Sequence, residues 1–321
     1  MREATVLGIE IGGTKLQVAV GNAEGEIHLL EQGRVAPSEG AAGILSWLEG
    51  SVQDLLEQAA NKGYPPPTKA GIGFGGPVES ATGKVLTSHQ IDGWKDVELR
   101  AWFEAAFPGV TAGVYNDSNA AGWAEYKRGA GQGCQNFAYM NIGSGIGGAL
   151  VLNGRLYDGQ GRGAGEMGHT YVADWTAATP GAVDKLELLC SGWSIERRLR
   201  GPGFVPKDSL LWKWCEGQPE KLRCAQLAQA AQGQDPFALA ELDRVAAALG
   251  IAVSNLFTLF HPQRLALGGG VALMGDPLLE PLRRHVAQRV FSPFAERYEI
   301  VPCQLEESVV VVGALLLSGC R

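Results

Sequence analysis

Short apolar runs alternate with glycine-rich turns along this chain, and one such plan occurs twice, far apart in the sequence. The mostly apolar stretch 6–11 leads into Gly12-Gly13-Thr14 and a second, mostly apolar run over 16–20. Residues 139–142 lead in the same way into Gly143-Ser144-Gly145 and another apolar run. Glycine turns of this kind let backbone N–H groups approach an anion without interference from a Cβ atom. The repetition therefore predicts two phosphate-binding hairpins, one in each of two lobes.

The first half of the chain shows strand and helix patterns in turn. Apolar residues at helical spacing predict a helix over 44–60, and Pro65-Pro66-Pro67 ends it. The pattern predicts in addition a β-meander over 5–35, a strand over 70–74, a short helix over 97–107 and a strand over 110–115. That last strand runs into the polar segment 116–119, after which we expect a helix.

The second half repeats this order of strands followed by helices. Asn153-Gly154 is a strong hairpin signal, and Asp235-Pro236 is a typical start of a helix, which we expect to reach His261. A strand over 264–267 meets Gly268-Gly269-Gly270, Asp276-Pro277 starts a further helix, and the last helix ends near Gly319, whereas 201–235 shows no clear pattern. We therefore expect an α/β protein of two similar lobes with a cleft between them: 1–116 plus about 303–321, and 117–302.

Composition and charge narrow the class of protein. The chain of 321 residues is 45% hydrophobic and carries a net charge of −7 without a basic stretch, which argues against nucleic acid as a partner. No apolar run approaches the roughly 20 residues that span a bilayer. A strand pattern begins almost at once, so we expect no leader. The six cysteines are scattered and contain no C-x-x-C pair. We expect free thiols and a cytoplasmic protein that does not bind membranes.

Two polar segments are candidates for chemistry. Asp117 in the segment Asn116-Asp117-Ser118-Asn119 either caps the following helix or acts as a base at the end of a strand. An aspartate is ordinarily ionised at pH 7 and accepts the proton of a hydroxyl that attacks a phosphoryl group. Glu166 and His169, three residues apart among glycines, suit hydrogen bonds to vicinal hydroxyls, although a solvated loop with a structural histidine is the alternative.

Together these motifs resemble the ROK family, which contains sugar kinases and sugar-responsive repressors. The resemblance covers nearly the whole chain and rests on motifs in the family's order: E-I-G-G-T-K (10–15), G-F-G-G-P-V (73–78), D-G-W (92–94), N-D-S-N-A-A (116–121), N-I-G-S-G-I-G-G (141–148), G-E-M-G-H (165–169), L-E-L-L-C-S-G (186–192) and L-G-G-G-V (267–271). It implies the actin-like ATPase (ribonuclease H-like) fold, with two similar lobes and an interlobe cleft, and a homodimer.

The resemblance also implies a role for each matching residue. Asp117 matches the catalytic base that deprotonates a sugar 6-hydroxyl. The sugar contacts match Gly76, Asn116, Glu166, His169 and Glu187. The first phosphate loop matches Gly12, Gly13, Thr14 and Lys15, the second matches Gly143, Ser144 and Gly145, and the nucleotide end matches Gly269 and Gly270. The implied ligands are a hexose, ATP and Mg²⁺.

Three departures from the family pattern affect the site. Glu10 replaces the usual aspartate. It is the candidate residue for holding Mg²⁺, and its side chain is one methylene group longer than that of aspartate. Gln90 stands where the family usually has an asparagine near the sugar. The zinc motif C-x-C-G-x-x-G-C is replaced by residues 178–185, which contain no cysteine, and His169 alone cannot hold a tetrahedral zinc ion. We predict no structural zinc, and expect packing that involves Trp175 to hold this segment.

The function expected from these observations is ATP-dependent phosphorylation of a hexose at its 6-hydroxyl, as in a glucokinase. An N-acetylhexosamine kinase or a fructokinase of the same family remains open, as does polyphosphate as the donor. A non-catalytic sugar-binding regulator is a further alternative. The first strand begins within ten residues of the start, so we expect no helix-turn-helix domain before it. A chaperone ATPase of the same fold is disfavoured by the pair Glu166 and His169, which suits polyol recognition.

Overall fold

The computed structural model describes residues 4–88, 90–305 and 307–319, and it divides into two compact units. Unit 1 contains Met1–Gly133, Ala149–Ala164 and Gln304–Arg321, and unit 2 contains Cys134–Gly148 and Gly165–Cys303. The expected lobe boundary at residue 116 differs from this division. The helix that follows Asn116 packs within unit 1 against the C-terminal helix, so it belongs to the first unit.

Unit 1 is built on a five-stranded sheet. Its strands are β1 (Val6–Ile11), β2 (Lys15–Gly21), β3 (Ile27–Arg34), β4 (Lys69–Phe74) and β7 (Thr111–Asn116). Their order in the sheet is β3-β2-β1-β4-β7. The meander β1-β2-β3 is antiparallel, whereas β4 and β7 run parallel to β1. The parallel strands therefore bring their carboxyl ends to the same edge of the sheet.

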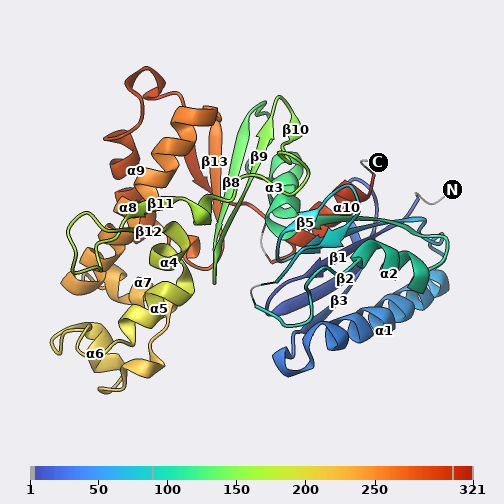
Figure 1. Cartoon of the computed structure of the whole chain (residues 1–321), viewed down its shortest axis with the longest axis horizontal. Helices are drawn as coiled ribbons and strands as arrows, with labels where there is room; N and C mark the ends of the chain where they lie inside the picture. Colours follow the sequence, from blue (N-terminus) through green and yellow to red (C-terminus); the bar gives the residue numbers. More distant parts are fainter. Residues whose placement is uncertain (1–3, 89, 306, 320–321) are drawn as a thin grey trace. The chain divides into compact units, whose positions relative to one another are not determined.

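Helices cover both faces of this sheet (Figure 1). They are α1 (Gly40–Asn61), α2 (Leu99–Ala106), α3 (Asp117–Arg128) and α10 (Val309–Ser318). One face packs on α1 and α2 in a core that includes Ile9, Ile44 and Phe103. The other face packs on α10, where Val311 and Leu315 contact Val6 and Ala19.

Glycines in the strands allow α10 to lie close to the sheet. A Cβ atom on Gly8 of β1 would lie 2.6 Å from Leu315 Cγ, and one on Gly73 of β4 would lie 2.6 Å from Val310 Cγ1. A Cβ atom on Gly71 would overlap the backbone oxygen of Ala314. The high glycine content thus serves close helix packing as well as the turns expected from the sequence.

The second five-stranded sheet repeats the order of the first. Its strands are β8 (Phe137–Ile142), β9 (Ile146–Leu152), β10 (Arg155–Leu156), β13 (Arg264–Gly268) and β14 (Glu299–Pro302). The order is β10-β9-β8-β13-β14, and the division between the units falls inside β9. The predicted hairpin at Asn153-Gly154 is confirmed, because both residues have positive φ and join β9 to the antiparallel β10. The expected mixed α/β fold with a repeated plan is therefore confirmed.

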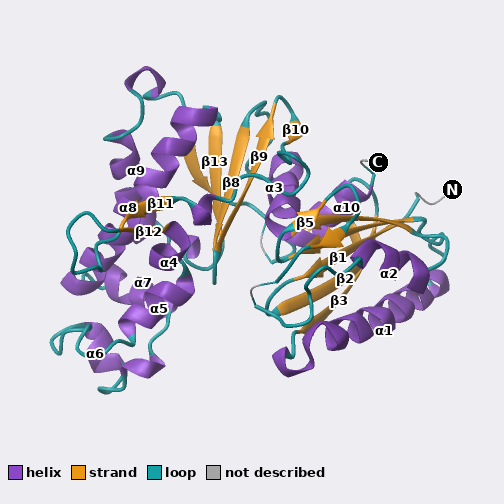
Figure 2. Cartoon of the chain, in the orientation of Figure 1, coloured by secondary structure: helices purple, strands orange, loops and turns teal. Residues whose placement is uncertain are grey.

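Helices form most of the remainder of unit 2 (Figure 2). They are α4 (Leu186–Cys190), α5 (Gly192–Leu199), α6 (Leu210–Trp214), α7 (Cys224–Gln232), α8 (Pro236–Phe260) and α9 (Asp276–Ala287). Asp235 caps α8 as predicted, since its Oδ1 accepts a hydrogen bond of 2.8 Å from Ala238 N. The segment 201–235, which showed no pattern, contains α6 and α7.

Short elements complete the described chain. The two small hairpins are β5 (Val78–Glu79) with β6 (Lys84–Val85), and β11 (Tyr171–Ala173) with β12 (Val183–Lys185). The 3-10 helices are Pro37–Glu39, Met167–His169, Pro219–Lys221, Ala272–Met274 and Ser292–Phe294. Among the described residues, no helix has both the length and the apolar character needed to cross a membrane.

Candidate active site

The candidate base lies where three parallel strands of unit 1 end. Ile11 pairs with Phe74, which pairs in turn with Asn116, so β1, β4 and β7 end side by side. Gly75 N donates a hydrogen bond of 2.8 Å to Ile11 O. A Cβ atom on Gly75 would lie 3.4 Å from Asp117 Oδ2 and 3.7 Å from Gly12 Cα. The half-buried Asp117 carboxylate is therefore held beside the turn after β4 and the first glycine turn.

Asn116, and not Asp117, is the N-cap of α3. Asn116 Oδ1 accepts hydrogen bonds from Ser118 N at 2.9 Å and Asn119 N at 3.2 Å. Its Nδ2 group donates at 3.1 Å to Gly76 O. Asn116, predicted as a sugar contact, thus orients the turn at Gly76 as well as the helix start. Asp117 is the first residue of the helix, and its Oδ1 accepts from Ser118 N at 2.7 Å.

The first glycine turn joins β1 to β2. Gly12 N donates to Lys15 O at 3.0 Å and closes the turn around the exposed Thr14. Gln90, expected near the sugar, lies directly against this turn, because a Cβ atom on Gly13 would overlap the Gln90 side-chain oxygen. The turn and Gln90 therefore belong to one cluster in unit 1.

A buried carboxylate lies under the first turn. Glu10 is 7% exposed, and its Oε2 lies 3.2 Å from Lys15 Nζ. Lys15 Nζ also donates to the backbone oxygen of Glu307. Burial raises the pKa of Glu10 from 4.5 to about 7, although Lys15 acts in the opposite direction and Asp117 adds to the rise. The ionised form of Glu10 is thus short of compensating positive charge.

The residues present fit a magnesium ion bound together with a nucleotide. Mg²⁺ in kinases is usually held by one or two carboxylates and by phosphate oxygens, and it keeps several waters. Glu10 supplies a buried carboxylate beside the first glycine turn, and a nearby cation would favour its ionised form. Glu10 is therefore the residue that would hold Mg²⁺ in unit 1.

In unit 2 the second glycine turn is bonded to a predicted sugar contact. Gly143 N donates to Gly145 O at 2.9 Å, with Ser144 half-buried between them. Glu187 Oε2 accepts a hydrogen bond of 2.7 Å from Ile146 N, directly after the turn. A Cβ atom on Gly145 would lie 2.6 Å from the same Glu187 oxygen. Glu187 on α4 therefore lies against the loop predicted to bind phosphate.

The Glu166–His169 loop packs on the same strand start. Gly168 comes so close to Ile146 that a Cβ atom there would overlap the Ile146 backbone oxygen. Met167 and Gly168 are buried, whereas the side chains of Glu166 and His169 are exposed. Glu187 and the Glu166–His169 loop thus both lie against the backbone of one residue, Ile146: Glu187 at its N–H group and Gly168 at its carbonyl oxygen.

The third glycine turn follows β13 and lies beside the end of β8. Gly269 has φ +85°, and a Cβ atom on it would lie 2.6 Å from the Ile142 backbone. Val271 N donates to Ile142 O at 2.8 Å, whereas a Cβ atom on Gly270 would meet no atom within 4 Å. The two glycines predicted for the nucleotide end therefore adjoin the second glycine turn in unit 2.

The residues present do not fit the family's zinc motif. The segment 170–186 contains no cysteine, and the described residues include no group of three or more His, Cys, Asp or Glu side chains able to hold a metal ion. The chain forms the hairpin of β11 and β12 at this place instead. The interaction expected of Trp175 is present, because its indole lies under the guanidinium of Arg198.

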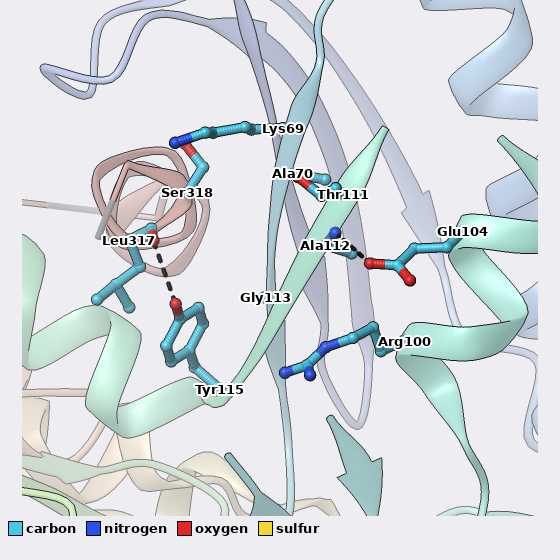
Figure 3. Close-up of a pocket in the computed structure, with 10 residues that line it drawn as sticks. All are labelled: Lys69, Ala70, Arg100, Glu104, Thr111, Ala112, Gly113, Tyr115, Leu317 and Ser318. Atoms are coloured by element: carbon cyan, nitrogen blue, oxygen red, sulfur yellow. Dashed lines mark hydrogen bonds between the residues drawn. The ribbon is translucent and has the colours of Figure 1, made fainter. Parts of the chain in front are cut away.

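One cavity lies away from these residues, at the edge of the first sheet (Figure 3). It has a volume of about 160 Å³ and is lined by Lys69, Ala70, Arg100, Glu104, Thr111, Ala112, Gly113, Tyr115, Leu317 and Ser318. Glu104 and Tyr115 are already bonded, to Ala112 N at 2.9 Å and to Leu317 O at 3.2 Å. None of the lining residues is a predicted site residue, so this cavity is separate from the candidate site.

Sequence reasoning missed residues that act through their backbone. The backbone of Ile146 contacts both Glu187 and the Glu166–His169 loop. Gly192 N donates a hydrogen bond of 2.7 Å to Gly143 O. Gly75 adjoins Asp117. All three residues stand inside motifs quoted above. The glycine residue type was the available signal at Gly192 and Gly75, whereas the apolar side chain of Ile146 does not indicate a backbone role.

Comparison with known proteins identifies the family of this chain. It is 30% identical to a glucokinase of Thermotoga maritima over 98% of this chain and 97% of that one. It is 25% identical to the xylose repressor of Caldicellulosiruptor bescii over 98% of this chain and 77% of that one. The structure is similar to that of a ROK family glucokinase from Streptomyces griseus, solved with glucose and AMPPNP, with a TM-score of 0.81, 26% identity and coverage of 99% and 100%. The sequence profile of the ROK family matches residues 6–319, and the chain therefore belongs to the ROK family.

Proposed function

We propose that this protein is an ATP-dependent sugar kinase that phosphorylates a hexose at its 6-hydroxyl, with Asp117 as the general base. The observation that carries the proposal is the place of Asp117. Its carboxylate lies at the carboxyl ends of β4 and β7, beside Gly75 and the first glycine turn. The similarity to proteins named glucokinase, in sequence and in structure, supports the same reaction class.

In the proposed reaction Asp117 takes the proton of the sugar 6-hydroxyl. The sugar oxygen forms a bond to the γ-phosphorus of ATP, and the bond from that phosphorus to the bridging oxygen breaks to release ADP. The hydrogen bond from Ser118 N to Oδ1 fixes the Asp117 carboxylate, while Oδ2 faces Gly75. Positioning and charge stabilisation supply most of the rate gain in this class of reaction.

The proposed ligand contacts are the residues that match the family's motifs. For the sugar they are Gly76, Gln90, Asn116, Glu166, His169 and Glu187, and for ATP they are Gly12, Gly13, Thr14, Lys15, Gly143, Ser144, Gly145, Gly269 and Gly270. Bound Mg²⁺ supplies neutralisation of charge on the phosphate oxygens, and Glu10 would hold it. Backbone N–H groups of the glycine turns bind phosphate without requiring a basic surface.

The experiment is a coupled ADP-release assay with Mg-ATP and a panel of glucose, mannose, fructose, N-acetylglucosamine and N-acetylmannosamine. We expect turnover that depends on a sugar, with glucose as the first candidate. A preference for fructose or for an N-acetylhexosamine would correct the substrate and keep the reaction class. A parallel arm with polyphosphate in place of ATP identifies the donor.

The repressor relative gives a second candidate, a sugar-binding protein without catalysis. If no sugar on the panel raises ADP release while one of them raises the melting temperature, this regulator is the better account. We also propose a homodimer, on the family resemblance alone. Light scattering coupled to size-exclusion chromatography checks it, and a monomeric mass of 34.0 kDa would contradict it.

A further inference from the structure

The hairpin at the place of the family's zinc motif is tied at both ends but carries an exposed connection. Its strands pair Tyr171 with Lys185, and Asp174 N donates to Ala182 O at 2.8 Å. Leu186 N, at the start of α4, donates to Thr170 O at 2.8 Å. The hairpin therefore leads directly into the helix that carries Glu187.

One buried arginine joins this hairpin to two helices. The guanidinium carbon of Arg198 lies 5.2 Å from the centre of the Trp175 ring, a cation–π distance. Arg198 Nε and Nη2 lie 2.9 Å and 2.8 Å from Glu241 Oε1 on α8, and Nη1 donates to Leu189 O on α4 at 2.6 Å. The side chain of Glu241 is fully buried and that of Arg198 is only 10% exposed.

These contacts fix the plane of the guanidinium. The buried carboxylate of Glu241 needs a permanent partner, because an uncompensated buried charge is strongly destabilising. Arginine stays charged and presents its donors in a rigid planar fork, so bonds to Glu241 and Leu189 along its edge leave a face for the indole of Trp175. The hairpin is thus held by a charged group that α8 immobilises.

The same contacts reach Glu187. Leu189, whose carbonyl accepts from Arg198, lies two residues after Glu187 in α4. The Ser194 hydroxyl on α5 donates a hydrogen bond of 3.0 Å to Glu187 O, and the Glu187 carboxylate accepts a hydrogen bond from Ile146 N. The orientation of Glu187 therefore depends on α4, whose C-terminal end is fixed by Arg198.

We propose that Trp175, Arg198 and Glu241 form a metal-free clamp that does the work of a structural metal ion, holding the β11–β12 hairpin and positioning Glu187. Arg198 is the member that contacts Trp175, Glu241 and Leu189, and none of these contacts requires a cysteine. Trp175 is a positioning residue, because it acts on the sugar through α4 and Glu187. The kinetic part of this inference rests on the proposed sugar kinase function, whereas the structural part does not.

The test compares Trp175→Ala with Trp175→Phe, which keeps an aromatic face, and with Trp214→Ala, which removes an exposed indole from α6. Arg198 and Glu241 stay intact, so that no buried charge is left without a partner. The first readout is hydrogen exchange of the amides in 170–186. We expect faster exchange in Trp175→Ala, partial protection in Trp175→Phe, and no change in Trp214→Ala.

The second readout separates KM from kcat for the sugar that the panel identifies. A cation–π contact of about 1 kcal/mol corresponds to roughly a fivefold effect. We expect Trp175→Ala to raise the sugar KM by roughly fivefold with an unchanged KM for ATP, and Trp175→Phe to restore most of the loss. An unselective fall of stability would not produce this split.

The third readout concerns metal and needs no activity. We expect the purified parent protein to contain no stoichiometric zinc and to keep its melting temperature in the presence of a zinc chelator. Stoichiometric zinc, or a melting temperature that the chelator lowers, would overturn the proposal, as would unchanged exchange of 170–186 in Trp175→Ala. If no sugar is phosphorylated, the proposed function fails, while the exchange and metal readouts still decide the clamp.

Discussion

Glu125 offers a sharp test of how the chain is anchored where it passes between the units. Its side chain is fully buried on α3, and its carboxylate accepts from Ala130 N at 2.8 Å, Gln304 N at 3.0 Å and Leu305 N at 2.7 Å. The chain first leaves unit 1 after Gly133, and it returns to unit 1 for the last time at Gln304. One carboxylate thus holds the backbone close to both places.

Glu125→Gln keeps the shape but replaces one acceptor oxygen by a donor. If the amide oxygen faces Gln304 N and Leu305 N, the new NH₂ group faces Ala130 N, so one bond is lost and a buried donor is left unsatisfied. The two remaining bonds lose their charge-assisted strength, which falls from about 1.5–3 to about 1 kcal/mol each. The easier burial of a neutral amide offsets part of the sum. We expect a net loss of about 3 kcal/mol in the free energy of unfolding.

The assay is urea unfolding followed by tryptophan fluorescence, with Glu57→Gln on the exposed face of α1 as the control. Hydrogen exchange gives the local readout, since the amides of Ala130, Gln304 and Leu305 should exchange faster in Glu125→Gln. The reasoning would be refuted by a variant that unfolds within about 0.5 kcal/mol of the control, the range typical of surface substitutions, with all three amides still protected.

Two further predictions concern packing and pH. Gly313→Ala should destabilise the protein by about 2 kcal/mol in thermal unfolding, because the new Cβ atom overlaps Ala120 O. In the control Gly50→Ala in α1, the new Cβ atom meets no atom within 4 Å, so this variant should be more stable than the parent by about 0.5–1 kcal/mol. Equal effects at the two positions would contradict the close approach of α10 and α3. Burial raises the pKa of Glu10 from 4.5 to about 7, so in nucleotide-free protein its ionisation lowers stability progressively as pH rises from 4.5 to 7, by up to about 3 kcal/mol. Glu10→Gln should remove this loss and be more stable than the parent protein at pH 8 but not at pH 4.5, and a difference that does not change with pH would contradict the assignment.

Elements with local signals were predictable from the sequence. Asn153-Gly154 needs positive φ at both positions, and Asp235-Pro236 combines a cap with a residue suited to the first helical turn, so each signal contains its own structural cause. The β11–β12 hairpin was not predicted, because Tyr171–Ala173 and Val183–Lys185 are too short to show a pattern of alternation. Its stability comes from contacts with distant residues such as Arg198, which no local pattern reveals.

The candidate site was predictable in its residues but not in their connections. Motif spacing selected Asn116 and Asp117, yet only the geometry shows that Asn116 caps α3 and bonds to Gly76. The bond from Ile146 N to Glu187 was equally invisible, since it involves a backbone group of an apolar residue. Side-chain chemistry can be inferred from sequence, whereas backbone donors become assignable only when the fold brings them to a partner.

The role of Asp117 is the central claim, and Asp117→Asn tests it most directly. The amide keeps the size of the side chain but cannot take a proton, and loss of a general base typically costs 10²–10⁴-fold in rate. With the sugar that the panel identifies, we expect kcat to fall by at least about 100-fold, while the melting temperature and the KM for ATP stay near those of the parent protein. Asp54→Asn on the exposed surface of α1 should leave kcat unchanged. An Asp117→Asn variant that retains kcat within about tenfold of the parent, below the range expected for a general base, would contradict the account.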